Sequence, residues 1–200
     1  LSPGGHSANV AINLAQLGLI SVHAVGSIGN DMMGGFMVDQ LESSGVKVHA
    51  ERQESTTAKN VALLVKGEDR RFIAELTANS MLTTSFLLDA IERISPNVFY
   101  QGTLGGLPDI ENNIAEILAK AHEEGAMTFL DVIMPTNGWR YLEDAYSSVD
   151  IFHCNIQEGA SLTVLSDPVA MIDYLIEKGI RLAIISDGGK GVTAGTCDIR

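Results

Sequence analysis

Short apolar runs alternate with well-delimited helical segments along most of the chain, and this alternation constrains the fold more than any other feature. The runs lie at residues 22–25, 98–100, 127–130, 151–154 and 182–185. Runs of this length, with a helix between most of them, are typical of buried parallel strands joined by crossover helices. The sequence therefore predicts a layered α/β fold with a mostly parallel central sheet, in which ligands bind at the carboxyl ends of the strands.

The helical segments carry recognisable start and stop signals. Asp167 is a candidate N-cap, Pro168 occupies the first helical position, and Gly179 closes the same helix. The apolar spacing predicts further helices at about residues 8–17, 34–44, 84–94 and 109–124.

One region breaks the alternation. Residues 61–65 and 71–76 are apolar and flank the polar turn 66–70. This pattern indicates an antiparallel hairpin at about residues 60–76, which we expect to act as a lid or a sheet edge. Because no repeat or long linker interrupts the remainder, residues 1–200 are expected to form a single α/β domain.

Composition narrows the range of partners. The 200 residues carry a formal net charge of −12, which disfavours nucleic acid and anionic membranes as partners. No apolar run reaches the roughly 20 residues of a membrane span. The two cysteines, Cys154 and Cys197, adjoin apolar stretches and are predicted to be buried free thiols in a reducing compartment, the cytoplasm.

Two glycine-containing motifs lie in the first part of the chain. Gly4 and Gly5 precede a helix that carries Asn9, so backbone N–H groups and an amide could meet a hydroxylated ligand there. A simple glycine turn that caps the helix is the alternative. In the second motif, Gly26-Ser27-Ile28-Gly29-Asn30-Asp31, the better explanation of Asp31 is that it caps the next helix.

Two further motifs follow strands in the second half. Asn155 and Glu158 share one face of a helical turn, where their oxygens could hold magnesium-bound water and phosphate. A helix-capping role explains this spacing equally well. Ser186-Asp187-Gly188-Gly189-Lys190-Gly191 could cradle phosphate through backbone N–H groups, could turn the chain into a hairpin with residues 192–196, or could do both.

Several other site types lack their sequence patterns. The chain contains no G-x-G-x-x-G dinucleotide fingerprint, no Walker A loop and no G-x-S-x-G nucleophile elbow. The five histidines do not adopt a zinc-ligand spacing.

Taken in order, these motifs resemble the signatures of the PfkB, or ribokinase-type, family of carbohydrate and nucleoside kinases. The first block runs from Gly4-Gly5 and Asn9 through Leu17-Gly18 to the second glycine motif and Gly34. Gly67-Glu68-Asp69-Arg70 with Ala78-Asn79, the Asn155-x-x-Glu158 pair and the Ser186–Gly191 loop resemble the later blocks. The chain departs from the family at Ser7, Thr77 and Ser186, and between Gly18 and Gly29 it is one residue longer than many members.

The resemblance implies a ribokinase-like three-layer α/β/α sandwich with a small β lid, and ATP- and Mg²⁺-dependent phosphorylation of a hydroxyl on a sugar or nucleoside. Gly4, Gly5 and Asn9 would then bind the substrate, and Ser186, Gly188 and Gly191 the nucleotide. Asn155 and Glu158 would act indirectly, on magnesium and phosphate. A homodimer formed through the lid is a further expectation.

The family's second signature, which carries the catalytic aspartate, is absent, because Gly-Ala-Gly-Asp occurs nowhere in this chain. The catalytic base is therefore unassigned, and we expect the native polypeptide to extend beyond both ends of these residues. Two rival functions stay open: a catalytically inactive sugar- or nucleotide-binding relative, and an NAD-dependent oxidoreductase, which would need the missing dinucleotide fingerprint.

Overall fold

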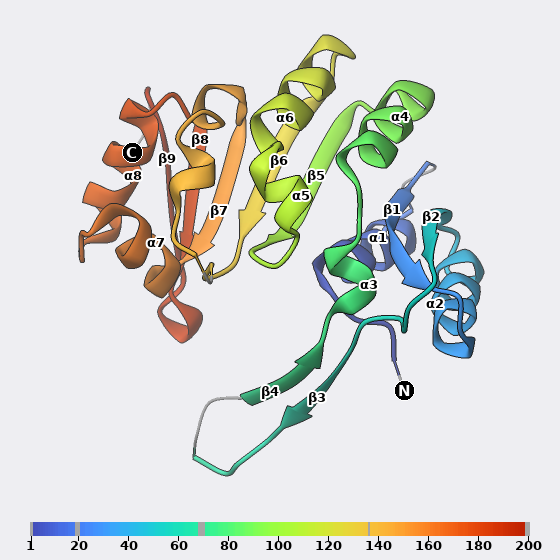
Figure 1. The fold of residues 1–200 in the computed structure, drawn as a ribbon. Helices are drawn as coiled ribbons and strands as arrows, with labels where there is room; N and C mark the ends of the chain where they lie inside the picture. Colours follow the sequence, from blue (N-terminus) through green and yellow to red (C-terminus); the bar gives the residue numbers. More distant parts are fainter. Residues whose placement is uncertain (1, 19–20, 68–70, 136, 199–200) are drawn as a thin grey trace. The chain divides into compact units, whose positions relative to one another are not determined.

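The structure is a computed structural model that describes residues 2–18, 21–67, 71–135 and 137–198 (Figure 1). It comprises two compact units, residues 1–83 and residues 84–200. The first unit contains α1 (His6–Gln16), β1 (His23–Gly29), α2 (Met32–Ser43), β2 (Lys47–Gln53), β3 (Lys59–Leu63), β4 (Arg71–Glu75) and α3 (Thr77–Ser80).

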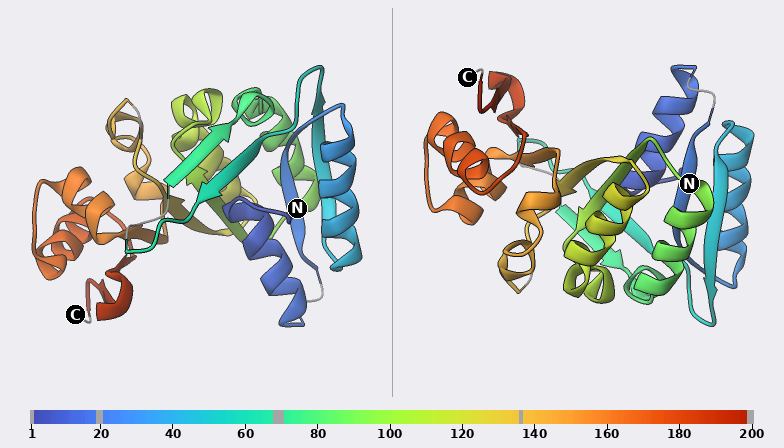
Figure 2. Two further views of the ribbon diagram at one scale, coloured as in Figure 1. Left: turned by 90° about the horizontal axis from the view of Figure 1, so that it is seen from below. Right: turned by 90° about the horizontal axis from the view of Figure 1, so that it is seen from above.

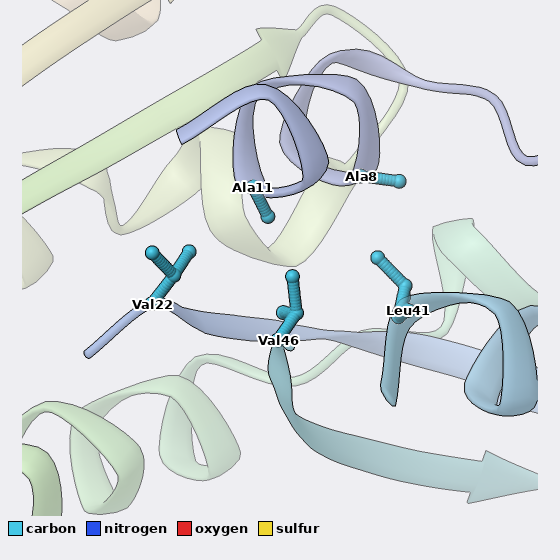
Figure 3. Close-up of a cluster of buried hydrophobic side chains, with 5 residues drawn as sticks. All are labelled: Ala8, Ala11, Val22, Leu41 and Val46. Atoms are coloured by element: carbon cyan, nitrogen blue, oxygen red, sulfur yellow. The ribbon is translucent and has the colours of Figure 1, made fainter. Parts of the chain in front are cut away.

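The core of the first unit is small and forms between two helices and the starts of two strands. Ala8 and Ala11 from α1 approach Leu41 from α2, together with Val22 and Val46, which immediately precede β1 and β2 (Figure 3). All five side chains are at most 9% exposed. Burial of this apolar surface is what holds α1 and α2 against the strand pair.

β2 is a strand that the apolar pattern does not predict. It pairs in parallel with β1, from His23 opposite Lys47 to Gly29 opposite Gln53. Three of its seven residues are charged (Lys47, Glu51 and Arg52), so the segment lacks the continuous apolar run by which the other parallel strands were recognised. Backbone pairing with β1 stabilises it instead.

The Asp31 cap is confirmed. Its Oδ1 accepts a hydrogen bond from the Gly34 N–H at 2.8 Å at the start of α2. The same carboxylate accepts bonds from the Thr57 hydroxyl at 2.6 Å and the Thr57 N–H at 3.0 Å. The bonds from Thr57, with that from Gly34, lower the pKa of Asp31 to about 2. At Gly29, a Cβ would collide with the Ser55 carbonyl oxygen and lie 2.5 Å from the Thr57 nitrogen.

The predicted hairpin is present. β3 and β4 pair antiparallel from Lys59 opposite Glu75 to Leu63 opposite Arg71. Apolar side chains on it are exposed, with Val61 at 59%, Phe72 at 57% and Ile73 at 65%. The turn residues 68–70 of the family-like segment lie outside the described residues.

The second unit is built on a five-stranded sheet. Its strand order is β5-β6-β7-β8-β9, parallel through β8, with β9 antiparallel to β8. The elements are α4 (Thr84–Ile94), β5 (Val98–Leu104), α5 (Pro108–Asn112), α6 (Ile114–Glu123), β6 (Met127–Val132), η1 (Arg140–Leu142), η2 (Tyr146–Ser148), β7 (Ile151–Asn155), α7 (Ile156–Thr163), α8 (Pro168–Glu177), β8 (Leu182–Ser186), η3 (Gly188–Lys190) and β9 (Val192–Thr196).

The two faces of this sheet differ in burial. Helices α6 and α8 pack on the sheet, and Leu130, Phe152 and Ile185 are at most 1% exposed. The alternating positions, such as Phe129 and His153, are only half-buried. The half-buried face is therefore the one on which polar side chains can meet a ligand.

The prediction of a single helix at 109–124 is wrong, because the chain forms two helices, α5 and α6, with a break at Asn113. The backbone of Asn113 leaves the helical region, with φ −120° and ψ 16°. Its side-chain amide donates to the Asp109 carbonyl at 2.8 Å and to the Thr84 hydroxyl at 3.2 Å. An asparagine side chain that bonds to nearby backbone competes with helix continuation.

The prediction for the cysteines is half right. Cys154 is a buried free thiol, and burial raises its pKa to about 12. Cys197 is free but exposed, because it follows the edge strand β9, whose residues are themselves largely exposed or half-buried.

Helices α7 and α8 pack against each other beside the last three strands (Figure 2). Asp167 caps α8 as predicted, since its side chain accepts a bond from the Ala170 N–H at 2.9 Å. Among the described residues, no single helix is long and apolar enough to cross a membrane, although α7 and α8 taken together as a bent pair reach the necessary length and composition.

Candidate active site

Asn155 and Glu158 lie where β7 passes into α7. Asn155 is the N-cap of α7, and its Oδ1 accepts bonds from the N–H groups of Gln157 and Glu158, both at 2.9 Å. The Glu158 Oε2 accepts a bond from the Asn155 N–H at 2.7 Å, which completes a reciprocal capping box. The capping role left open by the sequence is therefore present, and it fixes a 9% exposed carboxylate at the end of a parallel strand.

The glycine-rich turn begins at the last residue of β8. Ser186 pairs with Val192 across the hairpin that β8 and β9 form, so the hairpin alternative is confirmed. The Asp187 N–H donates to the Gly191 carbonyl at 2.9 Å. Gly188 and Gly191 have φ values of 51° and 106°, which residues other than glycine rarely adopt. No heavy atom lies within 4 Å of a Cβ built at either glycine, so their backbone is open to an approaching group.

The sheet brings these two motifs together. β7 and β8 are parallel neighbours, and Asn155 stands opposite Ser186 in the register. The capping box and the glycine turn therefore occupy one edge of the sheet, formed by the carboxyl ends of adjacent strands. This edge is where α/β proteins bind ligands.

The residues at this edge fit a magnesium ion held through water and phosphate better than one bound directly. The Asn155 oxygen is occupied by two backbone N–H groups. In the described part of the chain, no group of three or more His, Cys, Asp or Glu residues could hold a metal. Since Mg²⁺ keeps several waters and often shares substrate phosphates, an indirect contact from Glu158 matches this donor set.

Gly4, Gly5 and Asn9 belong to the other compact unit, at the start of α1. Gly5 precedes the helix with φ 90°, and its carbonyl accepts the Asn9 N–H at 3.1 Å. A Cβ at Gly4 or Gly5 would meet no atom within 4 Å, and Asn9 is exposed. The turn thus caps the helix and also leaves its backbone and the Asn9 amide open.

A polar cluster on the half-buried face of the sheet was missed by the sequence analysis. The Tyr100 hydroxyl donates to Asp131 Oδ2 at 2.7 Å, and Asp131 Oδ1 lies 2.7 Å from His153 Nδ1. The hydrogen bond from Asp131 raises the pKa of His153, and burial, then Asp131, raises that of Tyr100. The signal in the sequence was weak: Asp131 and His153 are polar residues in the mainly apolar strands β6 and β7. The sequence does not show that these two strands pair.

Comparison with known proteins places this arrangement in a family. The family model described as "pfkB family carbohydrate kinase" matches residues 1–197. Fructokinase from Solanum tuberosum is 26% identical over 196 residues, which are 95% of this chain and 60% of that protein. The chain therefore spans about 60% of the length of this curated relative.

Solved structures that resemble this chain are also kinases. Fructokinase with bound ATP from Xylella fastidiosa matches with a TM-score of 0.80 and 26% identity, over 99% of this chain and 67% of that one. Ribokinase from Giardia lamblia gives a TM-score of 0.85 at 15% identity, over 98% of this chain and 62% of that one, a likeness of fold alone. The ribokinase-like α/β fold predicted from the sequence is confirmed, and the chain belongs to the pfkB family of carbohydrate kinases.

Proposed function

We propose that the protein containing this chain transfers a phosphoryl group from ATP to a hydroxyl of a sugar or related small molecule. The observation that carries the proposal is the register of β7 and β8, which sets the Asn155–Glu158 capping box beside the Ser186–Gly191 turn. The ATP bound to the similar Xylella fructokinase supports the choice of phosphoryl donor.

On the nucleotide side, Ser186, Gly188 and Gly191 line the ATP site. The open backbone at the two glycines lets N–H groups approach phosphate oxygens without a side chain between them. Phosphoryl transfer depends mainly on positioning and charge stabilisation, so a rigid turn held at a strand end suits it.

Asn155 and Glu158 order the phosphate region through magnesium and its waters. When bound, Mg²⁺ supplies charge neutralisation at the phosphate oxygens. The capping box keeps the Glu158 carboxylate in one orientation, because Glu158 is tied to the Asn155 N–H.

On the acceptor side, Gly4, Gly5 and Asn9 bind the hydroxylated substrate. The Asn9 amide both donates and accepts hydrogen bonds, as a sugar hydroxyl requires. The base that removes the hydroxyl proton is not among the residues assigned to this site.

We also propose that the hairpin of β3 and β4 serves as a lid, and that two copies of the protein pair through it. The exposed side chains of Val61, Phe72 and Ile73 support an apolar contact there. We place the activity in the cytoplasm, where ATP is available and free thiols stay reduced.

The test is an assay of ADP release by the native polypeptide against ribose, fructose, a keto-deoxy sugar acid and a nucleoside. One acceptor class should raise ADP release well above ATP alone. Asn9→Ala should raise the KM for that acceptor far more than the KM for ATP. Asn13→Ala, an exposed change one turn further along α1, is the matched control and should alter neither.

Two outcomes would reject the proposal. If nucleotide and sugar bind but no acceptor stimulates ADP release, the protein is a binding relative and not a kinase. If the protein instead reduces a nicotinamide cofactor, it is an oxidoreductase.

A further inference from the structure

A groove lined by aromatic side chains lies on the second unit, between the segment that follows β6 and helices α7 and α8. Its volume is about 480 Å³, within the range of small-molecule sites. The walls are Trp139, Tyr146, Leu162 and Tyr174. These residues come from the segment between β6 and β7 and from helices α7 and α8.

The aromatic rings are held in place. The Trp139 indole N–H donates to the Ser161 hydroxyl at 3.0 Å, which ties the segment after β6 to α7. Trp139 also contacts the Tyr141 ring, with 6.4 Å between centroids. Tyr146 is only 6% exposed and Leu162 only 9%. Trp139 and Tyr174 are only half-buried, so their rings offer faces to a flat ligand at little cost in side-chain entropy.

Two cations stand at the groove. Arg140 and Lys178 both line it and are exposed, and neither forms an ion pair with another described residue. The Lys178 ammonium lies 5.4 Å from the centre of the Tyr174 ring. Glu143 is the one carboxylate among the lining residues. In a chain of net charge −12, two cationic side chains that form no ion pair within the described residues make a local positive site beside the aromatic rings.

No residue that lines the groove belongs to the candidate active site. Tyr146 precedes β7 by five residues and Lys178 precedes β8 by four, so both adjoin the amino ends of those strands. Asn155 and Ser186 end the same two strands. A ligand in the groove would therefore occupy a second site.

We propose that this groove binds a small molecule in which an aromatic ring is joined to a phosphate or carboxylate group. The ring stacks against Trp139 and Tyr174. The guanidinium of Arg140 and the ammonium of Lys178 take the anionic group, since a guanidinium matches the paired oxygens of phosphate and carboxylate. The inference does not depend on the proposed kinase activity.

Fluorescence offers a local measurement, because Trp139 is the only tryptophan of the 200 residues. The chain is titrated with AMP for the phosphate source and with benzoate for the carboxylate source. Adenosine, which has the aromatic ring without the anionic group, and inorganic phosphate, which has the anion without the ring, are titrated in parallel. We expect a saturable change in the tryptophan emission with AMP or benzoate, and a clearly weaker response to adenosine or phosphate alone.

Variants assign the signal to the groove. Arg140→Gln and Lys178→Gln should each weaken binding by about tenfold, because each removes a charge-assisted hydrogen bond. Both side chains are exposed, so the fold should be retained. Arg52→Gln, which removes an equal exposed charge from the other unit, and Ser186→Ala, in the candidate nucleotide site, should leave the titration unchanged.

The proposal is overturned if neither AMP nor benzoate changes the emission at millimolar concentration, or if inorganic phosphate alone is as effective. It is also overturned if Arg140→Gln and Lys178→Gln bind as the unaltered chain does, or if Ser186→Ala abolishes the response.

Discussion

Replacing Asp150 with asparagine should destabilise the protein, because this buried carboxylate accepts hydrogen bonds from three residues at once. The Asp150 Oδ1 accepts a bond from the Arg181 guanidinium at 2.9 Å. Its Oδ2 accepts the Thr128 N–H at 2.9 Å and lies 3.0 Å from His122 Nε2. Asp150 is 9% exposed and Thr128 is fully buried. An amide in this position turns an NH₂ group toward at least one donor, which leaves that donor without an acceptor.

The expected loss in the free energy of unfolding is about 2 kcal/mol, the usual effect of removing hydrogen bonds to a buried charged group. For a protein of this size that corresponds to a fall in Tm of roughly 4–8 °C. Urea unfolding followed by circular dichroism measures it. Asp144→Asn, an exposed carboxylate in the same unit, is the matched control and should change stability by less than about 0.5 kcal/mol.

The pH dependence gives a second test of the same network. Burial raises the pKa of Asp150, but the bonds from the Thr128 N–H, His122 and Arg181 outweigh it and bring the pKa to about 2. The folded pKa lies below the unfolded value of 3.8, so the stabilisation is complete above that value and is lost as pH falls toward 2. The gap between the unaltered protein and Asp150→Asn should therefore narrow from pH 5 to pH 3. A constant gap, or a loss no larger than that of the control, would refute the reasoning.

Three further outcomes are expected. Glu158→Gln should raise the Mg²⁺ concentration that gives half-maximal rate, with circular dichroism unchanged, and an unaltered magnesium dependence would reduce Glu158 to a helix cap. Asp131→Asn should lower the pKa of His153, measured by NMR titration of the imidazole, because Asp131 is the main cause of its elevation; an equal pKa in both proteins would contradict the hydrogen bond. Gly29→Ala should lower stability by more than about 2 kcal/mol in thermal unfolding, because its Cβ would collide with backbone that cannot move aside; a Tm within 2 °C of the unaltered protein would show that this loop yields.

The elements that the sequence predicted well share a local cause. Asp31 and Asp167 cap their helices through bonds to residues three positions away. The strands that end at Asn155 and Ser186 are short, mainly apolar runs that end in a polar residue. In each case the stabilising contacts lie within a few residues or follow from a short hydrophobic pattern, so a reader of the sequence can find them.

The features that the sequence did not reveal depend on partners far away along the chain. β2 is a strand because β1 pairs with it, although its own residues are largely polar. At the helix break, the Asn113 amide bonds not only to the nearby Asp109 carbonyl but also to Thr84, 29 positions earlier. Cys197 is exposed because the strand before it, β9, lies at the edge of the sheet.

For the candidate site, the sequence by itself determined which residues can carry the chemistry: the Asn155–Glu158 spacing, the glycine turn after Ser186, and Gly4, Gly5 and Asn9. Only the tertiary structure decided that Asn155 stands opposite Ser186 and that Asp131 meets His153. The physical reason is that strand order and register are set by hydrogen bonds and packing between segments 22 to 31 residues apart. Each of these contacts depends on residues of two paired strands, so the sequence of one strand alone does not reveal its neighbour or its register.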